Sequence, residues 1–207
     1  MTDARTQIVA EGYDAMGEHF AEWRDRIVGD PRRWWAEHLT SQLTDGARVL
    51  ELGCGGGVPD TQLLAERFRV TAVDISAEQI RRAQENVPNA EFLVADFAAA
   101  DFDPGRFDAV VAFYSFNHVP RELLAGLFAR IRSWLVTDGL FLVALGTGDD
   151  EGWVGEWLGV TMFFSSFTPD TNSRLLDEAG FERLLDEVGT FLEPDGEATF
   201  QWVLARA

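Results

Sequence analysis

The feature that most constrains the fold of this chain is a series of short apolar runs between residues 48 and 145. Segments with helical periodicity separate these runs. Each run is nearly continuous, which is typical of strands that are buried on both faces of a parallel sheet. The five runs are Val49–Leu52, Val70–Val73, Phe92–Ala95, Phe107–Phe113 and Leu140–Leu145. Repeated strand–helix–strand units predict an α/β fold with right-handed crossover connections.

The segments between the runs carry helix signals of their own. Asp60–Phe68 follows a glycine-rich stretch and is predicted to be helical. Ser76 and Gln79 have the spacing of a capping box at the start of a helix. In Pro120–Val136, apolar residues repeat at helical spacing, and we expect Gly139 to stop this helix.

The two ends of the chain differ from its middle. Residues 1–44 have helical patterns broken near residues 29–31, and we expect them to form an N-terminal helical lid or substrate segment. After a predicted helix near Thr171–Ala179, two extended stretches flank a Pro-Asp-Gly turn at residues 194–196, which predicts a final antiparallel pair. The stretches are Phe181–Val188 and Ala198–Ala205. Residues 45–207 are then expected to form one domain.

The net charge argues against several classes of partner. The 207 residues include 35 acidic and 17 basic side chains, which gives a formal charge of −18. Sequence-independent binding of nucleic acid needs several Lys or Arg contacts to phosphates, and anionic lipid attracts basic surfaces. Every basic residue is Arg, so neither a Schiff-base lysine nor a P-loop lysine is possible. We therefore expect no nucleic-acid partner and no membrane partner.

Cysteine use and the lack of long apolar segments bear on the cellular compartment. Cys54 is the one cysteine of the sequence, so no intramolecular disulfide can form. The first residues are polar and show no secretory pattern, and no apolar run approaches the roughly 20 residues of a membrane helix. We expect a cytoplasmic protein that is a monomer or a homodimer.

A glycine-rich loop follows the first predicted strand, in the sequence Glu-Leu-Gly-Cys-Gly-Gly-Gly at residues 51–57. Glycines let the backbone turn tightly and approach a ligand, and the helix that follows offers free N–H groups to an anionic group. Asp74 ends the next strand, where an acid accepts hydrogen bonds from a ribose diol. The dinucleotide-binding fingerprint would need glycine at position 58, but that residue is Val58, which disfavours a nicotinamide oxidoreductase.

These motifs resemble those of class I S-adenosylmethionine-dependent methyltransferases. The resemblance is carried by Val49–Gly57, Val73–Ser76, Val94–Phe97, Phe107–Phe113 and Leu135–Leu142. It implies a Rossmann-like, doubly wound sheet of seven strands, mostly parallel with an antiparallel last strand. It also implies S-adenosyl-L-methionine as cofactor and S-adenosyl-L-homocysteine as product. The antiparallel last strand agrees with the pair predicted from the turn.

The resemblance assigns cofactor contacts to the ends of the first four strands. The glycine loop would wrap the methionine part, Asp74 would hold the ribose hydroxyls, and Asp96 would bind the adenine amino group. Asp96 could instead be a helix cap, and Cys54 a small loop residue. Glu51 could orient the loop, reach the amino-acid end of the cofactor or make a structural hydrogen bond. The expected cofactor-binding residues are Glu51, Gly53, Cys54, Gly55, Gly57, Asp74, Ile75, Asp96, Phe97, Phe113, Tyr114 and Ser115.

Methyl transfer from a sulfonium is an in-line displacement, so orientation can carry most of the acceleration and a base helps when the acceptor is a hydroxyl. His118 is the best candidate base, because it follows the fourth strand near the expected ligand site. It could equally cap the next helix or support the cofactor loop. Tyr13 resembles the N-terminal tyrosine of the family, and His19 is a second possible base. The scattered histidines suggest no metal site, so we expect metal-independent transfer.

Aromatic residues outside the nucleotide-binding core are expected to form an apolar lid over a small organic acceptor, although such residues are more often core. The candidates are Trp23, Trp34, Trp35, Trp153, Trp157, Met162, Phe163 and Phe164. The first hypothesis is therefore methyl transfer to a hydroxyl, amine or carbon of a small molecule. The alternative is an S-adenosylmethionine-binding protein of the same fold with another activity, because a fold does not fix its chemistry.

Overall fold

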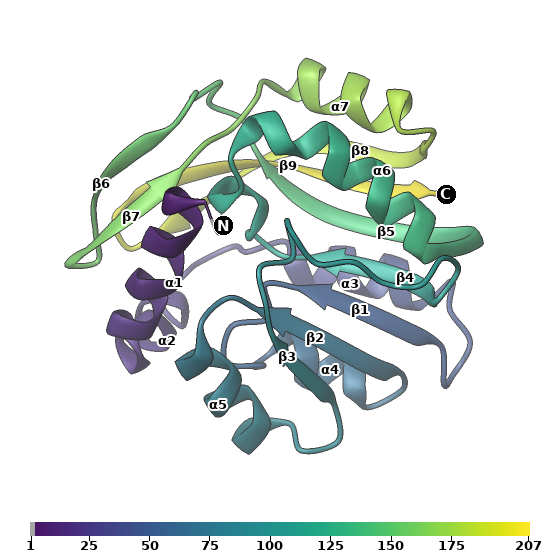
Figure 1. Cartoon of the computed structure of the whole chain (residues 1–207), viewed down its shortest axis with the longest axis horizontal. Coiled ribbons are helices and arrows are strands. Elements are labelled where there is room, and N and C mark those ends of the chain that lie inside the picture. The colour runs from purple at the N-terminus through teal and green to yellow at the C-terminus, as the bar shows by residue number, and fades with distance from the viewer. Residues whose placement is uncertain (1–2) are drawn as a thin grey trace.

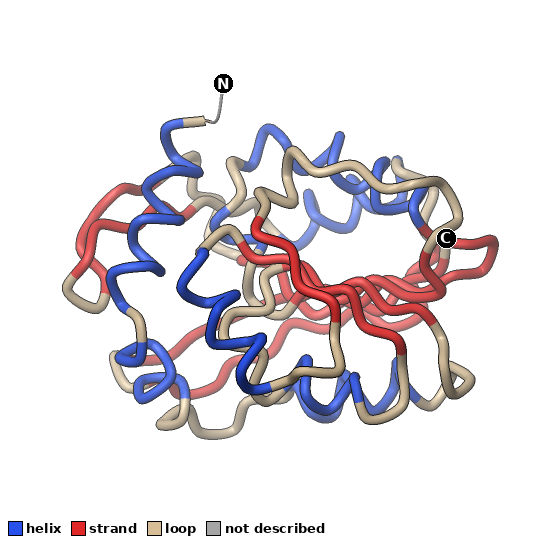
Figure 2. The backbone as a smooth tube through the Cα atoms, turned by 60° about the horizontal axis from the view of Figure 1, so that its bottom comes forward, coloured by secondary structure: helices blue, strands red, loops and turns tan. Residues whose placement is uncertain are grey.

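A seven-stranded sheet lies between two layers of helices in the computed structural model, which describes residues 3–207 (Figures 1 and 2). The strand order is β3-β2-β1-β4-β5-β9-β8, and β9 runs antiparallel to both of its neighbours. The strands are β1 (Arg48–Leu52), β2 (Arg69–Asp74), β3 (Glu91–Val94), β4 (Phe107–Ala112), β5 (Leu135–Gly146), β8 (Glu182–Glu193) and β9 (Gly196–Arg206). The predicted α/β sheet with an antiparallel last strand is confirmed.

Helices cover both faces of this sheet. They are α1 (Ala4–Met16), α2 (Glu18–Arg24), α3 (Arg32–Thr40), α4 (Asp60–Ala65), α5 (Ala77–Asn86), α6 (Leu124–Trp134) and α7 (Pro169–Glu178), with short 3-10 turns η1 (Phe116–His118) and η2 (Arg121–Leu123). In β1, Leu50 and Leu52 pack toward α6 and α7, whereas Val49 packs toward α3 and α4. Because successive side chains enter two different buried layers, the strand reads as a continuous apolar run.

The expected stop of the long helix at Gly139 is wrong. The helix α6 ends at Trp134, because Leu135 already has extended backbone angles and opens β5. Gly139 lies inside β5, beside Asp138, whose φ is +60°. The register between β4 and β5 shifts at this point, since Leu135 pairs with Phe107 and Leu140 with Ala109. The glycine therefore belongs to an irregularity in a strand.

The capping box before α5 is half formed. The Ser76 hydroxyl accepts a hydrogen bond from the Gln79 backbone N–H at 3.1 Å, as the sequence predicts. The Gln79 side chain does not return the bond but donates to the Gly17 carbonyl at 3.4 Å. This glutamine therefore links α5 to the boundary between α1 and α2.

A second, two-stranded sheet was not predicted from the sequence. It consists of β6 (Trp153–Trp157) and β7 (Val160–Phe164), which form an antiparallel hairpin. Helix α1 packs against β7, so the hairpin and the N-terminal helices lie side by side beyond one end of the main sheet (Figure 1). Aromatic residues in this region therefore have strand neighbours as well as helix neighbours.

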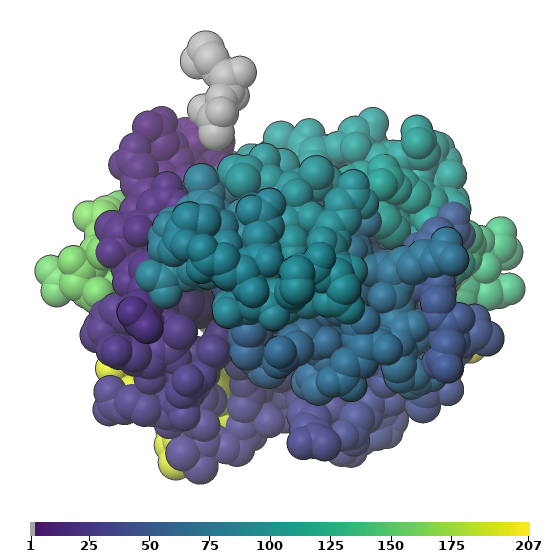
Figure 3. Space-filling view, turned by 90° about the horizontal axis from the view of Figure 1, so that it is seen from below, coloured from purple at the N-terminus to yellow at the C-terminus, as the bar shows by residue number. Residues whose placement is uncertain are grey.

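The N-terminal segment is tied to the tip of the β8–β9 hairpin. Val28 and Leu192 exchange two backbone hydrogen bonds of 2.9 and 3.1 Å. The indole N–H of Trp23 donates to the Asp195 carboxylate at 2.9 Å. We call these two contacts the clasp, and Figure 3 shows N-terminal residues lying against the C-terminal strands. Within residues 3–207, no helix has the length and apolar character needed to cross a bilayer.

Candidate active site

A cavity of about 550 Å³ lies at the carboxyl ends of β1, β2 and β4. One wall is made by the glycine loop after β1 and by the residues that follow β2 and β4. The other wall comes from α1, α2, the β6–β7 hairpin and the tip of the β8–β9 hairpin. The strands meet here because parallel strands direct all their carboxyl ends to one edge, where α/β sheets bind ligands.

The glycine loop is packed tightly against the end of β4. Gly53 has a φ of +80°, and a Cβ at this position would lie 2.3 Å from the Ser115 Cβ. The Ser115 hydroxyl donates to the Leu52 carbonyl at 2.7 Å, which fixes the two segments together. Only glycine fits at position 53 without moving the residues after β4.

Asp74 holds the loop from the other side. Its carboxylate accepts hydrogen bonds from the Gly55 N–H at 2.8 Å and from the Ser76 N–H at 2.9 Å. The side chain is buried, and burial raises its pKa above the ordinary value. A carboxylate has about four acceptor positions, so two backbone donors leave capacity for hydroxyl groups of a ligand in the cavity that Asp74 lines.

Tyr13 and His118 form a hydrogen-bonded pair at the cavity. The Tyr13 Oη and the His118 Nε2 are 2.9 Å apart, and the His118 Nδ1 lies 2.9 Å from the Phe163 carbonyl oxygen. Because a carbonyl can only accept, Nδ1 carries the proton and the neutral ring accepts the tyrosine proton at Nε2. Burial lowers the pKa of His118 to about 4 and raises the pKa of Tyr13, so both groups are uncharged near neutral pH.

Aromatic rings surround this pair. The Tyr13 ring meets Phe20 edge-on with ring centres 5.2 Å apart. Trp157 packs against Trp23 at 5.2 Å and against Phe164 at 5.6 Å. All five rings line the cavity. The part of the second wall that these rings form is therefore apolar and suited to a flat organic molecule.

Two arginines line the cavity near the glycine loop. Arg32 is almost fully buried and pairs with Asp30 at 2.5 Å and Asp60 at 2.8 Å. Its guanidinium lies 5.1 Å from the centre of the Tyr114 ring, and the Tyr114 hydroxyl donates to Asp30 at 2.5 Å. Arg24 donates to the Val58 carbonyl of the loop. These arginines place positive charge beside the glycine loop.

The structure brings many of the expected site residues to the cavity wall. From the cofactor set these are Gly53, Cys54, Gly55, Asp74, Ile75, Phe97, Phe113, Tyr114 and Ser115. From the catalytic and substrate sets they are Tyr13, His118, Trp23, Trp157 and Phe164. Burial raises the pKa of the Cys54 thiol, so it stays protonated.

Three expected cofactor residues lie outside the wall. Glu51 is buried beneath the loop and accepts a 2.6 Å hydrogen bond from Thr61. Burial and the nearby charge of Asp60 raise its pKa to about 8. Gly57 is packed against α5, and the Asp96 carboxylate accepts from the Ala98 N–H at 2.8 Å, as a cap does.

Six other expected residues also do not line the cavity. His19 is exposed near Glu22, and Trp34 is exposed against His38. Trp35 is buried in the core, where it stacks on Trp202. Trp153 is 47% exposed, whereas Met162 and Phe163 are buried under α1. An aromatic side chain buries equally well in core or cavity, so residue type alone did not separate these cases.

Some cavity residues were missed by the sequence reasoning. They include Phe20, Arg24, Arg32, Asn117, Ser166 and Glu193. The sequence held a signal only for Asn117, which adjoins His118 after the fourth strand. Among residues 3–207, no group of three or more His, Cys, Asp or Glu side chains is placed to hold a metal ion.

The family model described as "Methyltransferase domain" matches residues 49–139, from β1 into β5 and including the glycine loop and Asp74. The chain is therefore similar to methyltransferase domains over the segment that carries the glycine loop and Asp74. A curated relative of this chain is "Phosphatidylethanolamine N-methyltransferase" of Cereibacter sphaeroides, which is 32% identical over 57% of this chain and 63% of its own length. The chain spans 30–63% of the length of the first four curated relatives that it matches.

Solved structures share the fold of this chain at low identity. The 1,6-didemethyltoxoflavin-N1-methyltransferase of Burkholderia thailandensis, with bound 1,6-didemethyltoxoflavin and S-adenosylhomocysteine, aligns with a TM-score of 0.73 and 20% identity, covering 100% of this chain and 91% of that one. The [4+2]-cyclase SpnF aligns with a TM-score of 0.72 and 16% identity, covering 99% and 97%. These likenesses show the fold.

Proposed function

We propose that this protein transfers the methyl group of S-adenosylmethionine to a small organic acceptor, at a hydroxyl or amine group. The observation that carries the proposal is one cavity lined both by the glycine loop with Asp74 and by the Tyr13–His118 pair in an aromatic wall. Its volume of about 550 Å³ lies within the range of about 300–1,000 Å³ that is usual for small-molecule sites.

The residues of the first wall fit the cofactor. Gly55 lines the cavity, and no atom of a non-adjacent residue lies closer than 3.9 Å to its Cβ position. The loop backbone is therefore open to close approach, and Asp74 has acceptor capacity for ribose hydroxyls. Arg24 supplies positive charge for the α-carboxylate of the methionine part, whereas two aspartates already balance the charge of Arg32. The bound cofactor would supply an electrophilic methyl group on a sulfonium.

The Tyr13–His118 pair provides a route for the proton of a hydroxyl acceptor. Because His118 Nε2 already accepts from Tyr13, the acceptor proton passes to the tyrosine oxygen while the tyrosine proton moves to His118. The Phe163 carbonyl holds Nδ1–H, so the resulting imidazolium is stabilised by an oriented dipole. The aromatic wall excludes water and orients the acceptor.

The charge of the cavity bears on the acceptor. Asp150, Glu193 and Glu197 line it, and none of them lies within 4.0 Å of a charged nitrogen of another described residue. Burial and the neighbouring charges of Asp195 and Asp30 raise the pKa of Glu193 to about 7. Unpaired carboxylates repel anions, so we propose a neutral or cationic acceptor in place of a polycarboxylate.

Calorimetry with S-adenosylhomocysteine tests the cofactor part of the proposal. We expect binding to the wild type, and Asp74→Asn should weaken it about 10- to 100-fold, because hydrogen bonds to a charged group are lost. Asp170→Asn on α7, outside the cavity, serves as the control. NAD(P) binding in place of S-adenosylhomocysteine binding would contradict the proposal.

A substitution in the proton route tests the chemistry. Tyr13→Phe should lower kcat about 100-fold for a phenolic acceptor, because the proton route is cut, while the Kd of S-adenosylhomocysteine is unchanged. Release of S-adenosylhomocysteine from a panel of phenols and aromatic amines provides the assay. His118→Asn should behave in the same way, and His19→Asn, outside the cavity, should match the wild type. Equal turnover of Tyr13→Phe and wild type would remove this pair from the mechanism.

The fold shared with the [4+2]-cyclase SpnF supports a second candidate, a cofactor-binding protein that catalyses a reaction other than methyl transfer. Mass spectrometry of the products separates the two candidates. A product heavier by one methylene group supports methyl transfer. A product of unchanged mass, formed with intact S-adenosylmethionine, supports the second candidate.

A further inference from the structure

One end of the cavity holds polar groups whose hydrogen-bonding capacity the protein does not use. This end surrounds Gly146, the last residue of β5. A Cβ at Gly146 would lie 2.8 Å from the Ser166 Cβ and 3.7 Å from the Asn117 Cβ. Asn117 and Ser166 therefore flank the same point, and both line the cavity.

Asn117 has a fixed backbone and a free amide. It lies in η1, and its carbonyl oxygen accepts a 2.8 Å hydrogen bond from the Ser165 N–H. Its side-chain Oδ1 is shut off from solvent and has no hydrogen-bond donor among the described residues. An acceptor of this kind costs free energy that a ligand donor would recover. Since no hydrogen bond holds the amide and the last torsion of Asn is soft, the oxygen can turn into the cavity.

Ser166 offers the complementary group. Its side chain is 8% exposed, and its Oγ accepts from the Gly148 N–H at 3.1 Å and from the Asp150 N–H at 3.4 Å. These bonds use the oxygen lone pairs and leave the hydroxyl proton without an acceptor within residues 3–207. The two backbone donors also fix where the oxygen sits. Ser166 is therefore an oriented donor beside the Asn117 acceptor.

An acceptor and a donor side by side match the edge of an amide, which presents N–H and C=O in the same plane. We propose that Asn117 and Ser166 bind the lactam or carboxamide edge of the acceptor molecule, with its N–H donating to Asn117 Oδ1 and its C=O accepting from the Ser166 hydroxyl. This inference rests on the proposed function, since it names the substrate class of the same cavity. The neighbouring rings of His118, Trp157 and Phe164 favour a flat heteroaromatic lactam.

This edge would also set the position of the methyl acceptor. Asn117 and His118 line the same cavity, so a ligand held by the Asn117 amide shares this space with the Tyr13–His118 pair. Asn117 and Ser166 are then specificity residues, while Tyr13 and His118 move the proton. The two roles can be separated experimentally, because binding does not need the proton route.

Calorimetry with three matched probes tests the proposal: 2-quinolinone, N-methyl-2-quinolinone and quinoline. The first carries the whole amide edge, the second lacks its N–H, and the third lacks both groups. We expect the wild type, saturated with S-adenosylhomocysteine, to bind 2-quinolinone about tenfold more tightly than either analogue. Asn117→Leu should abolish this preference and leave the affinity for N-methyl-2-quinolinone unchanged. Ser166→Ala should weaken 2-quinolinone about tenfold.

Further variants keep the test decisive. Asn117→Asp retains an acceptor oxygen and should keep the preference for the N–H probe. Asn89→Leu and Ser133→Ala change an Asn and a Ser outside the cavity and should match the wild type. Equal affinity of the wild type for all three probes would overturn the proposal, and so would an unchanged preference in Asn117→Leu. The probe titrations are repeated without S-adenosylhomocysteine. If the protein binds the probes as expected but does not bind S-adenosylhomocysteine, that result contradicts the proposed function and leaves the Asn117–Ser166 site supported.

Discussion

At the scale of single residues, the candidate site contains groups whose protonation state or backbone conformation differs from that of the same residue in water. His118 is neutral with a pKa of about 4, and Glu51 has a pKa of about 8. Tyr114 has a φ of +61°, in a region that residues with a Cβ rarely adopt. Such strain and desolvation concentrate at functional sites, because the surrounding fold compensates for them.

Gly53 provides a test of the strain in the loop. Gly53→Ala should lower the free energy of unfolding by about 2–5 kcal/mol, because the new Cβ meets Ser115 at a backbone angle that favours glycine. Gly46→Ala is the matched control, since Gly46 has a similar φ of +81° and nothing within 4 Å of its Cβ position. We expect a loss of about 1–2 kcal/mol there. Urea unfolding measures both, and equal losses would show that the contact with Ser115 is unimportant.

Glu51 predicts a pH dependence of stability. Its pKa is raised in the folded state, so the folded protein keeps a proton that the unfolded chain releases above about pH 4.5. The contribution of Glu51 to the free energy of unfolding is therefore fully present below pH 4.5 and is lost as the pH rises to about 8. Relative to Glu51→Gln, the wild type should lose roughly 1.4 kcal/mol for each pH unit in this window. The free energy of unfolding of each protein is measured from pH 5 to 8. A difference between the two proteins that stays constant over this range would contradict the prediction.

At the scale of elements, the cavity is assembled from segments far apart in the chain. The main sheet supplies the glycine loop, whereas α1, α2 and both hairpins supply the facing wall. The clasp joins the N-terminal segment to the β8–β9 hairpin through Val28–Leu192 and Trp23–Asp195. An entering ligand must pass beside these elements, so their attachment bears on access to the site.

Trp23 tests the clasp. Trp23→Phe removes the hydrogen bond to Asp195 and part of the contact with Trp157, so residues before Arg32 should be cleaved several-fold faster by a protease. Added S-adenosylhomocysteine should reduce the difference, because we propose that it binds between the two walls. Trp34→Phe, on the exposed face of α3, is the control and should behave as the wild type. Identical cleavage of Trp23→Phe and wild type would show that the clasp does not hold this segment.

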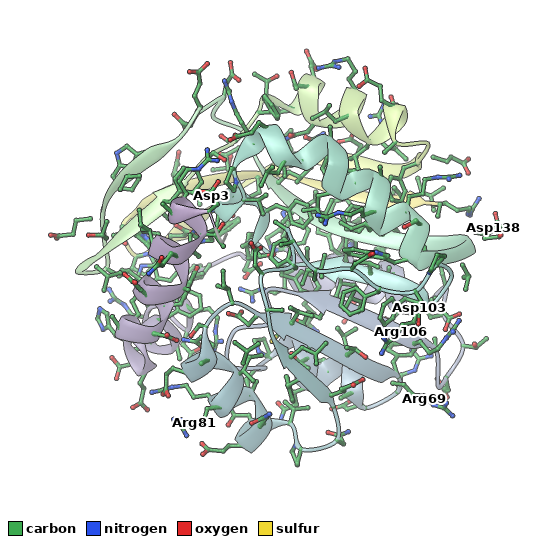
Figure 4. All side chains as sticks on the ribbon, viewed as in Figure 1. Asp3, Arg69, Arg81, Asp103, Arg106 and Asp138 are labelled. Atoms are coloured by element: carbon green, nitrogen blue, oxygen red, sulfur yellow. The ribbon has the colours of Figure 1, made fainter. Side chains whose placement is uncertain are left out.

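At the scale of the whole molecule, charge is distributed over the outside. Arg69, Arg81, Asp103, Arg106 and Asp138 project from the surface (Figure 4). Thirteen of the 17 arginines lie within 4.0 Å of a carboxylate in the described chain. Apart from the two buried pairs of Arg32, these pairs are mostly exposed and contribute little each, so the remaining negative charge dominates through self-repulsion.

Salt should therefore stabilise the protein. Raising NaCl from 20 to 500 mM shortens the Debye length to a few ångströms and screens the repulsion that comes from the formal charge of −18. We expect the Tm to rise by several degrees in differential scanning calorimetry. Replacing NaCl by sucrose of equal osmolality is the control for effects of the solute itself. A fall in Tm with NaCl would mean that the surface ion pairs outweigh the net charge.

The fold of the α/β sheet could be predicted well from the sequence. Val49–Leu52 and its neighbouring runs could be predicted because a strand buried on two faces must be apolar throughout. The loop at Gly53 could be predicted because strand, glycines and helix follow one another along the chain. The resemblance of these segments to a known family pointed to the same fold.

The second wall of the cavity could not be predicted in the same way. Trp35 and Trp157 have the same side chain, yet one stacks on Trp202 in the core and the other lines the cavity. The choice depends on how distant segments pack, which local pattern does not record. The partner of His118 was hidden for the same reason, because Tyr13 lies 105 residues away in the chain.

The division of the cavity into two walls has an evolutionary consequence. The matched family region, residues 49–139, contains the glycine loop and Asp74, whereas Tyr13, Trp157 and Glu193 lie outside it. Under the proposed function, mutations in the outer segments alter which acceptor enters while the wall proposed to hold the cofactor stays unchanged. New acceptors would then require changes only in the N-terminal helices and the two hairpins, which supply the second wall.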